Sequence, residues 1–284
     1  MISSISSASE YRPKSFNDMI GQDAIVKTLN NAIKNDNIPQ ALLFCGPRGV
    51  GKTSCARILA KTINNLEDDF EYNIFELDAA SNNSVEDIRN ITDQIRIPPQ
   101  TGRYKVYIID EVHMLSNQAF NAFLKSLEEP PEHVVFILAT TEKNKILPTI
   151  LSRCQIYDFK KVDNESIIKL LSKICKEKKV KYEDGSLSLI AERSDGSIRD
   201  SLSIFDRLVS FTDSNLTISE VTLNLNVLDF NTYFKISELI NKKDIPGILN
   251  LYNEVYIKGF DDINFLNGLS KHLRELLIYS LNSS

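Results

Sequence analysis

The chain has 284 residues, of which 42% are hydrophobic and 25% are charged. This composition is typical of a globular protein, and the length predicts about two domains. No run of about 18 apolar residues occurs, which argues against a membrane-spanning helix. The first ten residues, MISSISSASE, lack the basic start and apolar core of a signal peptide. We therefore expect a cytoplasmic protein whose residues 1–10 form a disordered lead-in.

Charge and cysteine content limit the partners and metal sites. A formal net charge of −5 excludes a surface coated with positive charge, so contact with nucleic acid would need a local basic patch. The four cysteines are scattered without a CxxC pair, which indicates neither a zinc site nor a disulfide framework. We expect Cys45 and Cys55, which flank a glycine-rich loop, to be small buried apolar residues.

The first predicted elements are a helix and a strand. Turn-forming residues surround an aromatic residue in 11–22, and apolar residues then recur at helical spacing through 23–35. The apolar run 41–45 (ALLFC) predicts a strand that stops at a glycine-rich turn, and a second helix is expected to end near Ile63.

Residues 41–53 (ALLFCGPRGVGKT) place a strand, a glycine-rich loop and a helix start in succession. Gly46 and Gly51, followed by Lys52 and Thr53, match the Walker A phosphate loop. Glycines let backbone N–H groups approach phosphate oxygens, and the helix start adds partial positive charge. Lys52 is expected to reach the β- and γ-phosphates, and Thr53 to ligate Mg²⁺. The predicted nucleotide-binding residues of this loop are Gly46, Pro47, Arg48, Gly49, Val50, Gly51, Lys52, Thr53 and Ser54.

The next two elements follow a polar, acidic connector, NNLEDDFEYN. A strand is predicted at 73–79 and a helix at 84–96. Ser84 is the expected N-cap of that helix, with acidic residues in its first turn. Pro98 and Pro99 end it.

Two carboxylates follow the apolar strand predicted from residue 105. The strand remains apolar up to Ile109 and then meets Asp110 and Glu111, which is the Walker B pattern. Asp110 is expected to hold Mg²⁺, directly or through water, and Glu111 to polarise the attacking water as a base. A surface acidic turn after a core strand is the alternative, which the Walker A loop upstream disfavours.

A helix at 117–128 and strands at 134–140 and 155–159 complete the predicted first domain. Strands that alternate with helices predict an α/β fold with a parallel, doubly wound sheet of five strands. Thr141 follows the carboxyl end of a strand, where such sheets bind ligands, so it is a candidate contact for the γ-phosphate. A helix-capping hydroxyl explains Thr141 equally well. From Asp163 onward the pattern is helical, which places the domain boundary near Val162.

Seven segments together resemble one known family. They are YRPKSFNDMIGQ, GPRGVGKTSCARILAK, ELDAASNNSVEDIR, KVYIIDEVHMLS, FNAFLKSLEEPPEHVVFILATT, LSRC and GSIRDSL, and in this order they resemble the gamma/tau subunit family of bacterial DNA polymerase III, the ATPase of the sliding-clamp loader. The likeness covers most of residues 10–210 and is weaker afterwards. It implies a P-loop NTPase domain of the AAA+ type at 11–162, a three-helix lid at 163–214 and a helical collar at 215–284 that joins subunits into a five-membered ring.

The resemblance also implies an activity and residue roles. ATP binding would let the assembly open the ring-shaped clamp, and primer-template DNA would trigger hydrolysis and release. Thr141 takes the sensor-1 position, Arg153 is the finger inserted into a neighbour's ATP site, and Arg199 is the sensor-2 arginine of the lid. An arginine from a neighbour accelerates other phosphoryl transfers by about 10³–10⁵ and makes turnover depend on assembly. The residues expected by the adenine are Tyr11, Arg12 and Pro13.

The sequence departs from the family pattern in three places. Family members usually carry a four-cysteine zinc module between the phosphate-loop helix and the second strand, but 64–73 contains no cysteine, so we predict no zinc. The chain ends at Ser284, inside the expected collar and without a tau extension, so we expect a shortened collar. Ser9 and Glu10 replace a usually basic pair before Tyr11.

Three arginines suggest a DNA contact. Arg89, Arg96 and Arg103 recur at intervals of seven, which predicts Arg89 and Arg96 on one helix face and Arg103 in the loop beyond Pro99. We hypothesise that they face the ring's central channel and track DNA phosphates. A solvated helix face is the alternative.

The leading interpretation is an ATPase motor that loads the sliding clamp onto primed DNA, with the other loader subunits, the clamp and primer-template DNA as partners and no membrane contact. A non-hydrolysing scaffold subunit is opposed by intact Lys52, Asp110 and Glu111. Another AAA+ machine, such as a branch-migration helicase, is the second alternative. A small-molecule P-loop kinase is disfavoured because Glu111 suits water activation. Any polymerase activity would belong to the holoenzyme.

Overall fold

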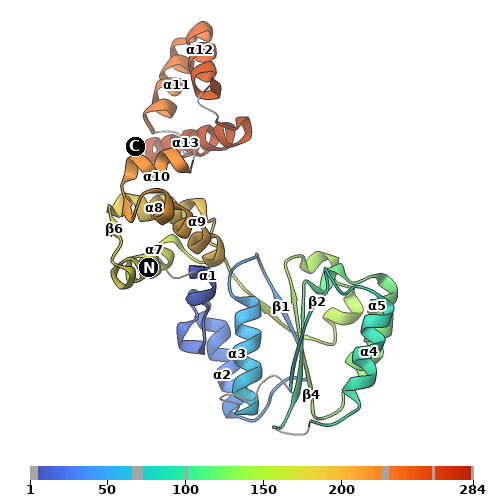
Figure 1. Cartoon of the computed structure of the whole chain (residues 1–284). Coiled ribbons are helices and arrows are strands. Elements are labelled where there is room, and N and C mark those ends of the chain that lie inside the picture. Colours follow the sequence, from blue (N-terminus) through green and yellow to red (C-terminus); the bar gives the residue numbers. More distant parts are fainter. Residues whose placement is uncertain (1–5, 66–72, 100–101, 226–229, 258–259, 283–284) are drawn as a thin grey trace. The chain divides into compact units, whose positions relative to one another are not determined.

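The computed structural model describes residues 6–65, 73–99, 102–225, 230–257 and 260–282. Within these ranges the chain forms two compact units (Figure 1). One contains residues 1–174 with 194–206, and the other contains residues 175–193 with 207–284.

A five-stranded parallel sheet forms the centre of the first unit, which confirms the predicted doubly wound α/β fold. Its strand order is β2-β3-β4-β1-β5, so β1 and β4 lie side by side in the interior. Each strand begins and ends within one residue of its predicted position. The strands are β1 (Ala41–Cys45), β2 (Ile74–Asp78), β3 (Lys105–Asp110), β4 (Val134–Thr140) and β5 (Gln155–Asp158).

Helices cover both faces of this sheet (Figure 1). Because side chains alternate along a strand, Leu42 and Phe44 of β1 point to one face and Leu43 and Cys45 to the other, and all four are buried. The first face packs against α2 (Asp23–Lys34) and α3 (Lys52–Asn64). The second packs against α4 (Val85–Ile95), α5 (Asn117–Glu128) and α6 (Pro148–Leu151).

An aromatic cluster joins the two strands beside the phosphate loop. The ring of Phe44 on β1 packs edge-on against Tyr157 of β5, with centroids 5.5 Å apart, and lies 5.1 Å from the ring of Phe159. Such contacts add to the hydrophobic free energy of burial. The cluster therefore fixes β5, and with it the backbone of Phe159, next to the end of β1.

The start of the chain differs from the expectation of disorder. Residues 1–5 lie outside the described ranges, but α1 (Ser7–Glu10) is one helical turn. The backbone N–H of Ser7 donates to one Asp206 carboxylate oxygen at 2.7 Å and the Ser7 hydroxyl donates to the other at 2.5 Å. These two hydrogen bonds to a charged acceptor order a segment that its composition alone predicts to be disordered.

Short elements link the larger ones. Three are 3₁₀ turns, η1 (Phe16–Asp18), η3 (Val112–Met114) and η4 (Lys143–Lys145), and none was predicted from the sequence. After β5 come α7 (Asn164–Lys178), α8 (Asp184–Arg193) and α9 (Ile198–Phe211), as the helical pattern indicates. The boundaries at residues 162 and 214 stay predictions.

The second unit contains two elements that the sequence did not reveal. Strands β6 (Lys181–Tyr182) and β7 (Asn215–Leu216) pair in parallel, although only helices were expected here. Two residues are too few to show a strand period, which explains the omission. Beyond β7 lie α10 (Ile218–Asn224), α11 (Phe230–Lys242), α12 (Ile245–Ile257) and α13 (Asp262–Asn282).

The last three helices share a small core and a large apolar surface. Ile236, Val255 and Phe265 are buried together. Yet Ile245 is 66% exposed and Ile257 is 81% exposed. Among the described residues, every helix is too short or too polar to span a lipid bilayer.

Loss of Phe44 should destabilise the first unit. We expect Phe44→Ala to lower the free energy of unfolding by about 3–5 kcal/mol, because the cavity would lie among buried aromatic rings. Urea denaturation followed by circular dichroism measures this. Ile97→Ala is the control, since Ile97 is 60% exposed and should change little. Equal losses in the two variants would contradict the assigned core.

Candidate nucleotide-binding site

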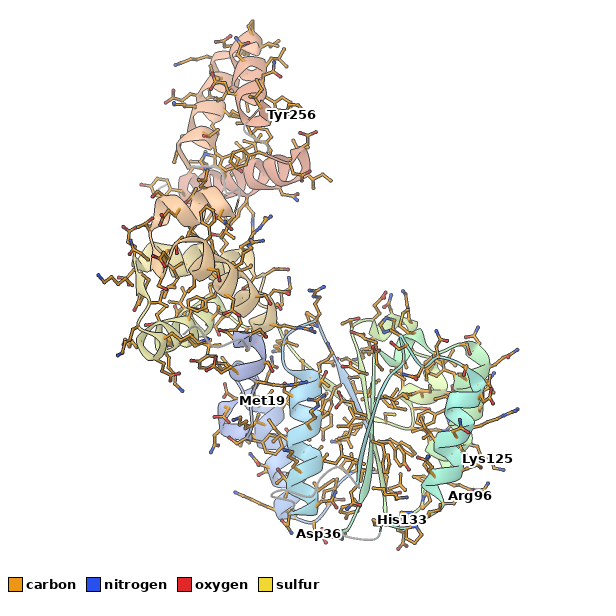
Figure 2. The ribbon with its side chains drawn as sticks, viewed as in Figure 1. Met19, Asp36, Arg96, Lys125, His133 and Tyr256 are labelled. Carbon is orange, nitrogen blue, oxygen red and sulfur yellow. The ribbon has the colours of Figure 1, made fainter. Side chains whose placement is uncertain are left out.

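The phosphate loop between β1 and α3 is shaped by residues with positive φ. Gly46, Gly49 and Gly51 have φ of 147°, 72° and 99°, which favour glycine. A Cβ on Gly46 would lie 2.4 Å from the carbonyl oxygen of Phe159, so no side chain fits there without moving backbone. A Cβ on Gly51 would meet Met19 at 2.9 Å, which places Met19 against the loop (Figure 2). Sequence reasoning missed Met19.

Lys52 begins α3 and is buried. Its Nζ donates to the carbonyl oxygens of Gly46 at 2.8 Å and Pro47 at 2.7 Å. Burial lowers the pKa of Lys52, and the nearby Glu111 and Asp110 carboxylates oppose this effect. The ammonium group is thus held inside the curve of the loop, where it can bind an anion.

Thr53 and Asp110 lie together, as Walker A and Walker B predict. The Thr53 hydroxyl donates to Asp110 Oδ2 at 2.6 Å, and Asp110 Oδ1 accepts the backbone N–H of Glu111 at 2.9 Å. Hydroxyl and carboxylate oxygens are hard ligands of the kind that Mg²⁺ prefers. In nucleotide sites Mg²⁺ usually has only one or two protein ligands, and phosphates and water supply the others. These two residues fit a nucleotide-bound Mg²⁺.

The side chain of Glu111 turns toward the end of β4. Glu111 has φ of 47°, an uncommon conformation for a non-glycine residue that occurs preferentially at functional sites. Its Oε2 accepts the backbone N–H of Thr141 at 3.2 Å and the Thr141 hydroxyl at 3.0 Å. The structure therefore brings together the predicted base and the predicted sensor residue.

His113 and Glu142 are members of this cluster that sequence reasoning missed. The Nδ1 atom of His113 lies 3.4 Å from Glu111 Oε2, and its Nε2 lies 3.3 Å from Glu142 Oε1. Nδ1 also lies 3.0 Å from the Thr140 hydroxyl. The sequence held one signal that could have pointed to His113. It lies in the turn directly after Asp110 and Glu111, and that turn faces the end of β4.

The segment that carries Arg199 contacts the phosphate loop directly. The backbone N–H groups of Ile198 and Arg199 donate to the Gly49 carbonyl at 3.0 and 3.3 Å. The Arg48 guanidinium pairs with Asp200 at 3.0 Å. Arg199 itself is exposed beside the loop, consistent with a position from which it can reach a nucleotide.

The residues predicted to lie by the adenine adjoin the start of α3. The Arg12 Nε donates to the Ser54 hydroxyl at 3.2 Å. Burial, followed by the positive charge of nearby Arg57, lowers the pKa of Arg12. A cavity of about 590 Å³ is lined by Arg12, Pro13, Ser54 and Arg57 among others. Tyr11, next in the chain, is half-buried.

Arg153 is separate from this cluster. It follows α6, where its guanidinium donates to the Thr149 carbonyl at 2.5 Å and pairs with Glu128 at 2.6 Å. Within the described part of the chain, the structure does not bring Arg153 to the phosphate loop of the same protomer. This separation is what a residue acting on a neighbour's site requires.

The three arginines of the DNA hypothesis are exposed but are not grouped. Helix α4 ends at Ile95, so Arg96 lies in the turn beyond the helix that carries Arg89. Arg103 pairs with Asp36 at the end of α2, on the opposite face of the sheet from α4 (Figure 2). Arg96 directly follows the last residue of the helix, so the shared face of Arg89 and Arg96 stays a prediction.

The predicted absence of zinc concerns a segment that is mostly undescribed. Residues 66–72 of the connector lie outside the described ranges. Elsewhere, no group of three or more His, Cys, Asp or Glu side chains is arranged to hold a metal ion. The absence of zinc stays a prediction.

Two family models match the chain. The model described as "DNA polymerase III, delta subunit" matches residues 21–74 and 71–163. The model described as "DNA polymerase III clamp loader subunit, ATPase lid domain" matches residues 166–214. Together they cover the sheet and nearly all of helices α7 to α9.

Relatives agree with the family models. The chain is 40% identical to DNA polymerase III subunit tau of Bacillus subtilis over 95% of its own length, and it spans 51% of that relative's length. It is 38% identical to DNA polymerase III subunit gamma of Buchnera aphidicola, covering 95% of this chain and 76% of the relative.

Solved structures show the same fold. The Holliday junction branch migration motor RuvB of Thermotoga maritima matches with a TM-score of 0.61 over 82% of this chain and 80% of that one, at 21% identity. This likeness shows that the two proteins share a fold. The sequence matches show that the chain belongs to the gamma/tau subunit family of DNA polymerase III.

Proposed function

We propose that the chain is an ATPase motor subunit of a sliding-clamp loader, which uses ATP binding and hydrolysis to place the clamp on primed DNA. The observation that carries this proposal is the convergence of five side chains at one edge of the sheet. Lys52 lies inside the phosphate loop, Thr53 contacts Asp110, and Glu111 contacts Thr141. Each is the residue type that hydrolysis of a Mg²⁺-bound triphosphate needs.

The contacts support the following roles. Backbone N–H groups of residues 48–53 bind the phosphates, and Lys52 stabilises the charge of the β- and γ-phosphates. Thr53 and Asp110 hold Mg²⁺, which neutralises phosphate charge when bound. Glu111 accepts a proton from the attacking water, while Thr141 orients Glu111 and contacts the γ-phosphate. Arg199 contacts the nucleotide from the lid, and Tyr11, Arg12 and Pro13 surround the adenine.

Assembly completes the site. We infer that Arg153 of one protomer enters the neighbour's ATP site and stabilises transition-state charge. The exposed apolar surface of α11 to α13 supports a collar that packs against other loader subunits in a five-membered ring. We also propose a cytoplasmic location, with the clamp and primer-template DNA as partners.

The intact base argues against a non-hydrolysing scaffold. Glu111 is held by Thr141 beside Asp110, an arrangement that mere nucleotide retention does not need. The fold likeness to RuvB does not favour helicase activity, because at 21% identity it concerns the fold alone.

Substitutions should separate ATP binding from hydrolysis. Lys52→Ala should weaken ATP affinity at least about 100-fold, because it removes a charged partner of the phosphates. Glu111→Gln should bind ATP within about threefold of wild type but hydrolyse it about 10²–10⁴ times more slowly. Calorimetry and phosphate release measure the two effects. The exposed Glu165→Gln is the control, and normal turnover by Glu111→Gln would remove that residue from its role.

Mixing should test whether sites are shared. When Arg153→Ala protein is mixed with wild-type subunits in the assembled loader, turnover should fall below the sum of the separate contributions, because a variant protomer disables its neighbour's site. Arg193→Ala, an exposed arginine, is the control. Rates that are additive in the wild-type fraction would argue against a shared site.

The DNA hypothesis gives different expectations for its three arginines. If Arg89 and Arg96 contact phosphates, the double alanine variant should reduce the slope of log K against log salt by about 1.8, since each contact contributes about 0.9. Arg103→Ala should change the slope less, because Asp36 already neutralises this charge. DNA binding by the assembled loader over a salt series measures both. An unchanged slope in the double variant counts against phosphate contact.

A further inference from the structure

The contacts of the Glu111 carboxylate are unevenly divided between its two oxygens. Oε2 accepts both hydrogen bonds from Thr141 and faces His113 Nδ1 at 3.4 Å. In the described part of the chain, no hydrogen bond or ion pair of Glu111 involves Oε1. The protein therefore fixes one oxygen of the base and leaves the other available to accept a proton.

His113 occupies a position between two carboxylates. Its side chain is 5% exposed, so its ring nitrogens need partners from the protein. Nδ1 faces Glu111 and the Thr140 hydroxyl, and Nε2 faces Glu142 at 3.3 Å. The imidazole thus connects the turn after β3 to the residues that end β4.

Glu142 is itself held in place. Its carboxylate pairs with Lys145 at 2.9 Å, and its backbone N–H donates to the Thr140 hydroxyl at 3.0 Å. The hydrogen bond from Lys145 lowers the pKa of Glu142, and His113 contributes in the same direction. Glu142 therefore provides a fixed anionic anchor for His113 Nε2.

We propose that His113 is a positioning residue for Glu111: anchored by Glu142 and the Thr140 hydroxyl, its imidazole holds Nδ1 against Glu111 Oε2, so that Oε1 faces the attacking water. The inference rests on the proposed ATPase function. Both hydrogen bonds from Thr141 end on Oε2, so with these alone the carboxylate of Glu111 could still rotate about that oxygen. The buried His113 ring, held from the turn after β3 at 3.4 Å from Oε2, restricts this motion, and a base that is displaced loses efficiency steeply.

Three substitutions of His113 separate its two contacts. His113→Asn keeps a donor near the Nδ1 position and loses the Nε2 contact, whereas His113→Gln keeps a donor near Nε2 and loses Nδ1. His113→Ala loses both. We expect kcat of the assembled loader to fall about tenfold in His113→Ala and His113→Gln, with His113→Asn restoring at least half of the logarithmic loss. The affinity for ATP should change less than about twofold in all three.

His133→Ala provides the control. The His133 ring contacts the Ile95 carbonyl and not Glu111, so kcat should stay within about threefold of wild type. Normal kcat in His113→Ala, or equal losses of kcat and ATP affinity across the series, would overturn the positioning role.

A spectroscopic measurement tests the contact without relying on activity. The chain has three histidines, His113, His133 and His272, so ring ¹⁵N signals of histidine-labelled protein can be assigned by substitution. Glu111→Gln should shift the ring signals of His113 and leave those of His133 and His272 unchanged, because His133 contacts Ile95 instead. Unchanged His113 signals would overturn the inference. If wild-type protein hydrolysed no ATP while His113 still responded, the proposed function would fail but the contact would stand.

Discussion

The site depends on the fact that neighbouring parallel strands end at the same edge of one sheet. Cys45, the last residue of β1, is paired with Thr140, the last residue of β4. β3 lies on the other side of β4 and ends in Asp110. Because both faces of these strands are buried and closely packed, a shift in register would disrupt the packing on both faces, so the register is strongly fixed. The packing of the strands therefore places the carboxylates and hydroxyls at their ends.

The phosphate loop depends on the same packing from two directions. Gly46 contacts the backbone that follows β5, and Gly49 accepts hydrogen bonds from the start of α9. The position of the loop therefore depends on the backbone after β5 and on the start of α9. A nucleotide bound in the loop would lie next to the segment that carries Arg199.

The sequence was informative where a pattern repeats or where chemistry demands particular residue types. Runs rich in apolar residues predicted the five strands, of which β1, β3 and β4 are buried along almost their whole length. Lys52, Thr53 and Asp110 stand at spacings that few other functions need. Contacts between distant residues were not predictable in this way. The ion pair of Arg103 with Asp36 joins residues 67 apart and depends on the completed fold. His113 was missed for a similar reason, since only the adjacent end of β4 gives its ring a role.

The central claim is that one protomer binds the triphosphate and the next supplies the arginine that makes hydrolysis possible. A cryo-electron microscopy structure of the assembled loader with clamp, primed DNA and ATP held by a transition-state mimic would test it most directly. The account predicts phosphates against residues 46–53 and Arg153 released from Glu128 to contact the neighbour's γ-phosphate position. Occupied sites with Arg153 still paired to Glu128 in every protomer would contradict it.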